Sequence, residues 1–147
     1  MKKISKKLKS DLFFSSGILS RMLQKIGKQE FETIGITHSQ AYILLIVNKY
    51  PGIAQHEIRD LLWFASSTVT RFVKNLEKKG YVIRAHEGKI TQVFPTDKSK
   101  ESINHINLVW SDLKGKYKDS LGKKFTRKLT EEMYESALFL GKSFKVI

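Results

Sequence analysis

The chain has 147 residues, 41% hydrophobic and 11% aromatic, which is enough for one folded domain and too apolar for a disordered segment. Its formal net charge of +13 indicates a polyanionic partner, but the charge alone does not distinguish between DNA, RNA and anionic lipid. The alternative is that the charge serves only to keep the protein soluble. The absence of cysteine excludes disulfides and thiolate metal sites, and the longest purely apolar run, residues 41–47, is far shorter than a membrane span of about 20 residues.

The N-terminal segment has the pattern of one long amphipathic helix, from about residue 5 to residue 32. Phe13 and Phe14 broaden its apolar face, so we expect this helix to bury that face in the core or against a second copy of the chain. An amphipathic pattern is unlike the continuous apolar core of a signal peptide, and we therefore expect a cytoplasmic protein. The apolar stripe consists of Ile4, Leu8, Leu12, Leu19, Leu23 and Ile26.

A capping box starts the second predicted helix. Thr37 and Gln40 have the spacing at which a hydroxyl and an amide satisfy the free N–H groups of a helix start, and Pro51-Gly52 stops the helix. Because residues 41–47 are nearly all apolar, this helix should be the buried centre of the fold.

A short third helix is predicted over residues 54–62. Ala54 has no side-chain oxygen that could cap this helix, so we expect its first turn to be less stable. Trp63 and Phe64 fill the next turn, and Ser66 is the best local N-cap for the helix that follows. The inward residues of the third helix are expected to be Ile58, Leu61 and Leu62.

A basic helix follows, with Val69, Phe72, Val73 and Leu76 at helical spacing and Gly80 as its stop. The opposite face carries hydroxyls, an amide and cations, which can bond base edges and phosphates as a helix in a DNA major groove does; a solvated face is the alternative. The candidate DNA-contacting residues are Ser66, Ser67, Thr68, Thr70, Arg71, Lys74, Asn75 and Lys78.

After Gly80 the apolar period changes to two, which predicts a hairpin with its turn at residues 87–89. A helix, a tight connection, a basic helix and a hairpin make a winged helix-turn-helix, whose second helix enters the major groove while the hairpin reaches the flanking DNA. Arg84 and Lys89 are the wing's cations and the candidate DNA contacts there.

Two more helices are predicted after the wing. Thr96 can cap the first, a break is expected near Leu121-Gly122, and Thr130 should cap the last, with Glu131 and Glu132 in its first turn. Their apolar seams are Ile103, Ile106, Trp110, Leu113 and Tyr117, and then Met133, Ala137, Leu140 and Phe144. Because the winged module closes its own core, we expect the terminal helices to pack together across a two-fold axis, folding back on the module alone being the alternative.

The order and spacing of these segments resemble the MarR family of bacterial transcription regulators. The matching stretches are GIT at 35–37, AQHEI at 54–58, STVTR at 67–71, NLEKKGYV at 75–82 and LTEE at 129–132. The resemblance implies a homodimer that binds double-stranded DNA at a palindromic operator and often responds to a small aromatic ligand. The fold is expected to be mainly α with a small β-hairpin wing. Residues 1–147 would form one domain, with a winged module at 33–96 and dimerisation helices at 1–32 and 97–147.

Two details of the resemblance concern the site. Family wings usually carry an Asp-x-Arg tip whose arginine enters the minor groove, but the tip here is Glu87-Gly88-Lys89, so we expect phosphate contacts from Arg84 and Lys89 instead. The family's effector cleft lies between the dimer helices and the winged module. It would draw on Phe13, Phe14, Tyr42, Trp63 and Trp110, although aromatic residues at helical spacing are usually core.

Catalytic patterns are missing from the sequence. The four histidines lack the H-E-x-x-H spacing, and no nucleophile elbow or Gly-rich phosphate loop is visible. We therefore expect no enzyme activity, cofactor or metal, a histidine and carboxylate metal sensor being the alternative. The preferred function is a dimeric, sequence-specific repressor. Its rivals are a nonspecific or architectural nucleic-acid binder and a winged-helix protein-interaction module.

Overall fold

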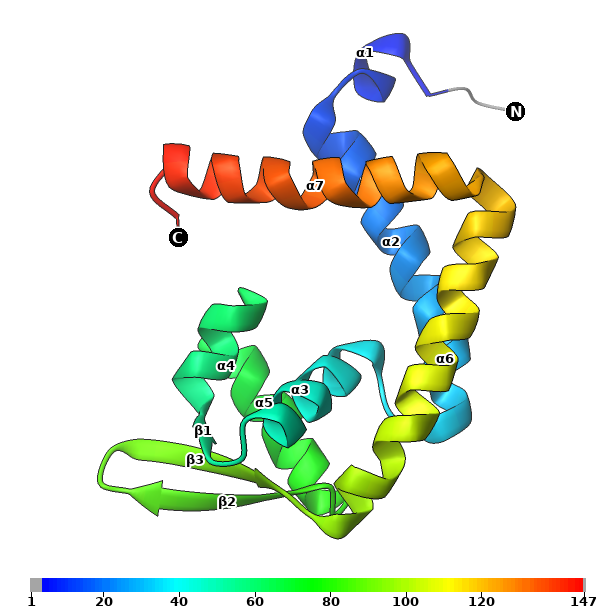
Figure 1. The fold of residues 1–147 in the computed structure, drawn as a ribbon. Coiled ribbons are helices and arrows are strands. Elements are labelled where there is room, and N and C mark those ends of the chain that lie inside the picture. The colour runs from blue at the N-terminus through cyan, green and yellow to red at the C-terminus, as the bar shows by residue number, and fades with distance from the viewer. Residues whose placement is uncertain (1–3, 147) are drawn as a thin grey trace. The chain divides into compact units, whose positions relative to one another are not determined.

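The computed structural model describes residues 4–146 and divides after Asn107 into two compact units (Figure 1). The first unit contains α1 (Lys6–Lys9), α2 (Leu12–Phe31), the 3-10 helix η1 (Glu32–Ile34), α3 (His38–Lys49), β1 (Ile53–Ala54), α4 (Gln55–Leu62), α5 (Ser66–Lys78), β2 (Val82–Glu87) and β3 (Ile90–Pro95). α6 (Asp97–Leu121) begins in this unit, and the second unit holds its remainder and α7 (Lys123–Ser143). The expected fold, mainly helical with a β wing, is confirmed.

The prediction of one helix over residues 5–32 is wrong, because the chain breaks between α1 and α2. The Ser10 hydroxyl donates to the carbonyls of Lys6 and Lys7 at 3.2 and 3.1 Å, and the Asp11 carboxylate accepts from the Phe14 N–H at 2.7 Å. Serine and aspartate compete with the helix for backbone groups and favour its ends. They therefore end α1 and start α2 within an otherwise continuous apolar stripe.

α3 is the buried centre of the winged module, as the sequence predicts. Its capping box is present: the Gln40 N–H donates to Thr37 Oγ1 at 3.2 Å, and the Thr37 N–H donates to Gln40 Oε1 at 3.0 Å. Ile43, Leu44 and Val47 are 0% exposed. The core that surrounds them contains Ile58, Val69, Val73, Leu76, Val82 and Val93.

α4 and α5 form the helix-turn-helix and pack on α3. The start of α4 has no side-chain cap from Ala54, but the Glu57 carboxylate accepts from the Ala54 N–H at 2.8 Å. Two predictions are wrong here. Leu61 is 57% exposed because it lies on the outer side of the short α4, and Ser66 is the first residue of α5 rather than its cap. Ala65 occupies the N-cap position, without a side-chain hydrogen bond.

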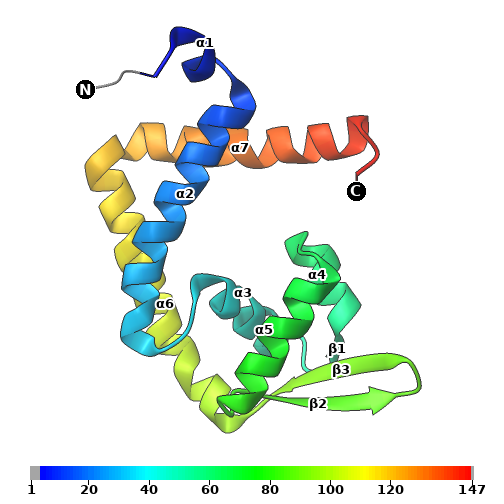
Figure 2. The same cartoon turned by 180° about the vertical axis from the view of Figure 1, so that it is seen from behind.

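The wing is a three-stranded antiparallel sheet in the order β1-β3-β2. In the hairpin, Val82 pairs with Pro95 and Glu87 with Ile90, and the short β1 adds Ile53 opposite Val93. Figure 2 shows the end of α5 beside the start of β2, so α5, the second helix of the helix-turn-helix and called the recognition helix below, leads straight into the wing. The sequence did not predict β1, whose two residues are too short to show a period.

Hydrogen bonds and a cation–π contact stabilise the base of the wing. The Thr96 hydroxyl donates toward the carbonyls of Gly80 and Tyr81 at 2.7 and 3.0 Å, and it accepts from the Ser99 N–H at 3.2 Å, which is the expected cap of α6. Lys98 Nζ lies 4.4 Å from the ring centroid of Tyr81. One threonine therefore joins the end of the recognition helix, the wing and α6.

In the second unit, α6 ends at Leu121 and Gly122 adopts a φ of 86°, so the expected break is present. The predicted start of the last helix at Thr130 is wrong. α7 already begins at Lys123, and the Thr130 hydroxyl donates to the Thr126 carbonyl at 2.9 Å inside the helix. A threonine hydroxyl can bond back to the carbonyl four residues earlier, so a cap-like residue type does not require a helix start.

Candidate nucleic-acid interface

α5 turns most of its predicted DNA-contacting residues to solvent. Because Val69, Val73 and Leu76 are buried against α3 and α4, the residues between them must face outward. Ser66, Ser67, Arg71, Lys74, Asn75 and Lys78 are exposed, and Thr68 and Thr70 are half-buried. The face combines hydroxyls and cations on one rigid helix, which suits contacts to phosphates and base edges. That these residues contact DNA stays a prediction.

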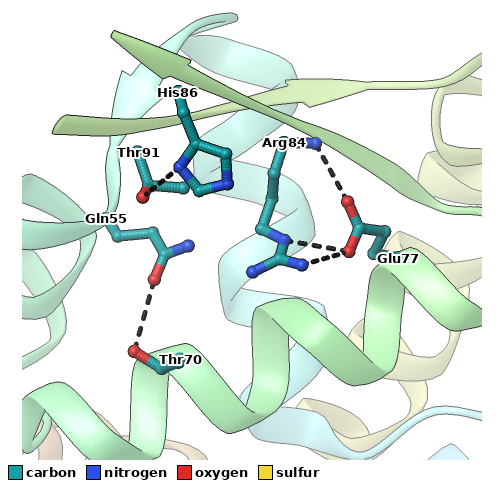
Figure 3. Close-up of polar contacts among 6 residues, drawn as sticks. All are labelled: Gln55, Thr70, Glu77, Arg84, His86 and Thr91. Atoms are coloured by element: carbon teal, nitrogen blue, oxygen red, sulfur yellow. Dashed lines mark hydrogen bonds and ion pairs between the residues drawn. The ribbon is translucent and has the colours of Figure 1, made fainter. Parts of the chain in front are cut away.

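Two of these side chains also hold α5 in place. Gln40, which is 3% exposed, donates from Nε2 to Asn75 Oδ1 at 2.7 Å, so the capping glutamine of α3 also anchors the recognition helix. Thr70 Oγ1 donates to Gln55 Oε1 of α4 at 3.4 Å (Figure 3). The sequence shows the Thr37-Gln40 box but gives no sign that Gln40 reaches Asn75, since the two residues are 35 positions apart.

Arg84 is tied to the recognition helix. Its Nε and Nη2 donate to Glu77 Oε2 at 2.9 and 2.6 Å, and its backbone N–H donates to Oε1 at 3.3 Å (Figure 3). The hydrogen bonds from the Arg84 side chain lower the pKa of Glu77, which therefore stays ionised at neutral pH. The pair neutralises the one acidic residue of α5 and fixes the start of the wing. Sequence reasoning missed this positioning role of Glu77.

The wing tip carries Lys89, which is exposed next to Gly88. Gly88 has a φ of 57°, a conformation that favours glycine in a tight hairpin turn. Just behind the tip, the Thr91 hydroxyl and His86 Nδ1 lie 3.1 Å apart (Figure 3). Lys89 thus stands at the end of a short, ordered hairpin.

The aromatic residues predicted for a ligand pocket are spread over several elements. Phe13 is 89% and Trp63 is 46% exposed, whereas Phe14, Tyr42 and Trp110 are half-buried. The ring of Tyr42 meets that of His38 edge-on at 5.8 Å. None of the five lines the apolar cleft described next, and their role as a ligand site stays a prediction.

That cleft, of about 470 Å³, lies between α2, η1, α3 and α5. Arg21, Lys25 and Lys28 of α2 line one side, and Phe72 of α5 is the aromatic residue at its wall. His38 also lines it; burial lowers the pKa of His38, so its imidazole is neutral at neutral pH. Glu32 of η1 also lines the cleft, 3.6 Å from Lys28 Nζ, so the cleft combines apolar surface with three cations and one carboxylate. Periodicity alone could not show it, because its residues come from separate elements.

Residues 36–87, which run from just before α3 to the end of β2, match the MarR family. This part of the chain belongs to the MarR family. A relative from Bacillus subtilis strain 168, the uncharacterised HTH-type transcriptional regulator YybA, is 28% identical over 95 residues. That alignment covers 63% of this chain and 63% of the relative, so it spans less than two thirds of the relative's length.

Solved structures share the fold along nearly the whole chain. A MarR protein from Peptoclostridium difficile has a TM-score of 0.83 at 22% identity, covering 100% of this chain and 99% of that one. A MarR-family regulator from Listeria monocytogenes, solved with a 26-mer DNA, has a TM-score of 0.75 at 23% identity, covering 91% of both chains. The repressor CouR, solved with p-coumaroyl-CoA, has a TM-score of 0.83 at 18% identity, covering 92% and 98%.

Membership in the MarR family, a family of transcriptional regulators, agrees with the expectation that the chain is not an enzyme. Among residues 4–146 the structure contains no cluster of three or more histidine, aspartate or glutamate side chains that could hold a metal ion. Within the same residues, no helix is both long enough and apolar enough to cross a membrane.

Proposed function

We propose that this MarR-family chain is a sequence-specific DNA-binding repressor that acts as a homodimer on a palindromic operator. The observation that carries the proposal is the outward face of α5, where Arg71, Lys74 and Lys78 are exposed beside hydroxyl side chains. Cations and hydroxyls on a helix that its neighbours hold rigidly can fit the major groove. The Listeria relative, solved with DNA, supports this assignment.

The first test is selection of duplexes from a random-sequence pool at physiological salt, followed by fluorescence anisotropy against a scrambled duplex. A two-fold symmetric site bound at least about a thousandfold better than the control supports a dimeric, sequence-specific regulator. Uniform binding of all duplexes would contradict sequence specificity.

Arg71 is the side chain on which we expect specificity to depend most. A bidentate contact from an arginine to a guanine discriminates by about 1–3 kcal/mol, so Arg71→Ala should relax sequence preference at one position of each half-site. Lys49→Ala is the matched control, since Lys49 is also an exposed cation of the winged module but lies at the end of α3, off the α5 face. Unchanged affinity and preference in Arg71→Ala would show that α5 does not read the groove through this residue.

The dimer is proposed from exposed apolar side chains on the terminal helices. On α2, Leu12 and Phe13 are 72% and 89% exposed, and at the C-terminal end Phe139 and Phe144 are 72% and 73% exposed. Clusters of this kind are rarely left uncovered in a monomer. Sedimentation equilibrium should give twice the 17.0 kDa chain mass at micromolar concentration. A monomer at every concentration would contradict the dimer.

A small aromatic ligand is the proposed effector, and the cleft of about 470 Å³ is the part of the chain that suits it. Its size falls within the range of about 300–1,000 Å³ for small-molecule sites. Phe72 could pack against a ring, and Lys25 and Lys28 favour a carboxylate on the ligand. The complex of CouR with p-coumaroyl-CoA supports an effector of this kind.

The effector proposal is tested with 4-hydroxybenzoate and, as the uncharged control, 4-hydroxybenzyl alcohol. The benzoate should raise the melting temperature and release the selected duplex, because a ligand acts on DNA binding only if it prefers one conformation of the dimer. A Lys25→Ala/Lys28→Ala double variant should lose the response. An equal effect of both compounds would contradict recognition of the carboxylate.

One observation favours the alternative of a nonspecific or architectural binder. The wing presents Lys89 to solvent, while Arg84 is paired with Glu77, and the net charge of +13 favours any polyanion. This alternative predicts similar, strongly salt-dependent affinity for selected and scrambled duplexes. The duplex selection therefore decides between the two functions.

A further inference from the structure

A second cleft, of about 190 Å³, opens where α4, the first half of α5 and the wing meet. The side chains that converge on it come from all three elements, although they are far apart in the sequence. Its polar lining includes His56 and Arg59 from α4, Ser66 and Thr70 from α5, and Lys89 and Thr91 from the wing.

The chemistry of this cleft suits a small anion. Arg59 and Lys89 supply two positive charges, and the Ser66 hydroxyl and the His56 imidazole supply further hydrogen-bonding groups, while the Thr70 and Thr91 hydroxyls already bond to Gln55 and His86. Among the described residues that line it, none is acidic. The cleft is smaller than the roughly 300–1,000 Å³ of pockets that hold drug-sized ligands, and its lining is mainly polar. A single phosphate group therefore fits it better than an organic effector does.

Arg59 also has an acidic neighbour outside the cleft. Its Nε and Nη2 both lie 2.7 Å from Asp60 Oδ1. The side chains of Arg59 and Asp60 are 39% and 60% exposed, and ion pairs at such exposure contribute little. The guanidinium has five N–H donors, so this contact leaves it donors for an anion in the cleft.

We propose that this cleft binds one phosphate of the DNA backbone, between the first helix of the helix-turn-helix and the wing. The inference rests on the proposed DNA-binding function and adds α4 to the interface through Arg59 and His56. Ser66 and Thr70 belong both to the cleft and to the outward face of α5, so the bound phosphate lies directly beside the groove that α5 enters. Figure 3 shows the two sides of this region, with Thr70 on α5 and Thr91 on the hairpin.

The position of the cleft predicts what the phosphate contact does. A contact shared by α4, α5 and the wing fixes the depth and angle at which α5 meets the duplex, while the contact itself carries no sequence information. Removing it should therefore weaken all duplexes alike. One phosphate contact accounts for a slope of about 0.9 in log K against log salt, which corresponds to about fivefold in affinity at 0.15 M salt.

The test compares Arg59→Ala and Arg59→Lys with wild type on the selected and the scrambled duplex at several salt concentrations. Lys49→Ala is the charge-matched control, because Lys49 is exposed on the same module and does not line the cleft. Arg59→Ala should bind both duplexes about fivefold more weakly at 0.15 M salt, with a slope lower by about 1, while Arg59→Lys and Lys49→Ala stay near wild type. Circular dichroism of each variant checks the fold.

A second measurement identifies which phosphate of the duplex the cleft binds. Neutral methylphosphonate linkages are placed one at a time along the duplex, and one position should weaken wild type about fivefold while leaving Arg59→Ala unaffected. Inorganic phosphate is titrated separately at constant ionic strength. A wild-type slope in Arg59→Ala, or an Arg59 effect on inorganic phosphate alone, overturns the proposal.

The failure of this inference can be told apart from the failure of the proposed function. If no sequence is enriched but Arg59→Ala still lowers the slope on both duplexes, specificity fails and the phosphate cleft stands. If wild type prefers an operator and Arg59→Ala binds it unchanged, the cleft fails and the regulator stands. If wild type binds neither duplex, both are wrong.

Discussion

Replacing Glu77 by glutamine should loosen the wing from the recognition helix. The Glu77 carboxylate accepts from Nε, Nη2 and the backbone N–H of Arg84, at 2.9, 2.6 and 3.3 Å. Glutamine keeps the shape of the side chain but offers Arg84 one neutral oxygen in place of a carboxylate. Glu77→Gln therefore removes the charge from the pair with little change in volume.

The size of the effect follows from how exposed the pair is. The side chains of Arg84 and Glu77 are 21% and 34% exposed, so solvent screens part of the interaction. Hydrogen bonds to charged groups contribute about 1.5–3 kcal/mol when well buried, and with this screening we expect a loss of about 1–2 kcal/mol for the whole pair. For a chain of this length the melting temperature should fall by about 3–8 °C.

The effect should depend on pH with a definite sign. The pKa of Glu77 in the folded chain is lowered from its ordinary value of 4.5, because the carboxylate accepts the Arg84 hydrogen bonds. The stabilisation is therefore complete above pH 4.5 and is lost as the pH falls through the folded-state pKa. Wild type and Glu77→Gln should differ most at neutral pH and converge in acid.

Urea unfolding of both proteins from pH 7 down to pH 3 measures this difference. Glu101→Gln is the matched control, because Glu101 is an exposed carboxylate on α6, outside the wing and α5. It should leave the free energy of unfolding nearly unchanged. If Glu77→Gln and Glu101→Gln had the same stability, or if the Glu77→Gln effect stayed constant down to pH 3, the pair would not stabilise the wing as argued.

Three further substitutions test how the module is built, each by urea unfolding at pH 7. Thr37→Ala should cost about 0.5–2 kcal/mol, because it removes the hydroxyl that accepts from the Gln40 N–H at 3.2 Å, whereas Thr37→Ser should retain most of the stability. Gly52→Ala should destabilise by about 1–2 kcal/mol, because the residue has a φ of +85° and a Cβ would lie 3.0 Å from the Phe94 ring. Gly115→Ala, inside α6 with no atom within 4 Å of the added Cβ, should instead stabilise by up to about 1 kcal/mol. A loss at Gly115 as large as that at Gly52 would contradict the backbone argument.

The parts of the fold that the sequence predicted well are those in which a local pattern and the core agree. The Thr37-Gln40 box lies directly before the apolar run that becomes the centre of α3, and both signals place the helix at the same residue. The change from period three and four to period two after Gly80 marks the end of α5 and the start of β2 for the same reason. Two independent signals at one position leave little room for another structure.

The errors occur where a single local signal stood alone. Thr130 resembles a cap, but nothing ends the helix before it, and its hydroxyl bonds to the carbonyl of Thr126 instead. At the N-terminus the apolar stripe continues through Ser10 and Asp11, so periodicity hid a break that these two polar side chains cause. An apolar stripe shows which face of a segment is apolar. It does not show whether the backbone between the apolar residues stays helical.

The candidate site was partly predictable for a similar reason. Helical spacing alone assigns Arg71, Lys74 and Lys78 to the outward face of α5, because their buried neighbours fix the face. The wing and the first helix of the helix-turn-helix gave no comparable signal. No pattern in the sequence marks Arg59, and its place at the cleft depends on the hairpin folding back beside α4.

The wing shows why charge cannot be assigned to a partner from the sequence alone. Arg84 and Lys89 look alike as cations of one hairpin, yet Arg84 faces Glu77 and Lys89 lines the cleft at the tip. The difference follows from position: Arg84 lies inside β2, opposite Val93, on the face that meets the only carboxylate of α5, whereas Lys89 lies in the turn between β2 and β3. Arg84 is thus a positioning residue in this structure, and we propose that the cations that meet a duplex are those of α5 together with Lys89 and Arg59.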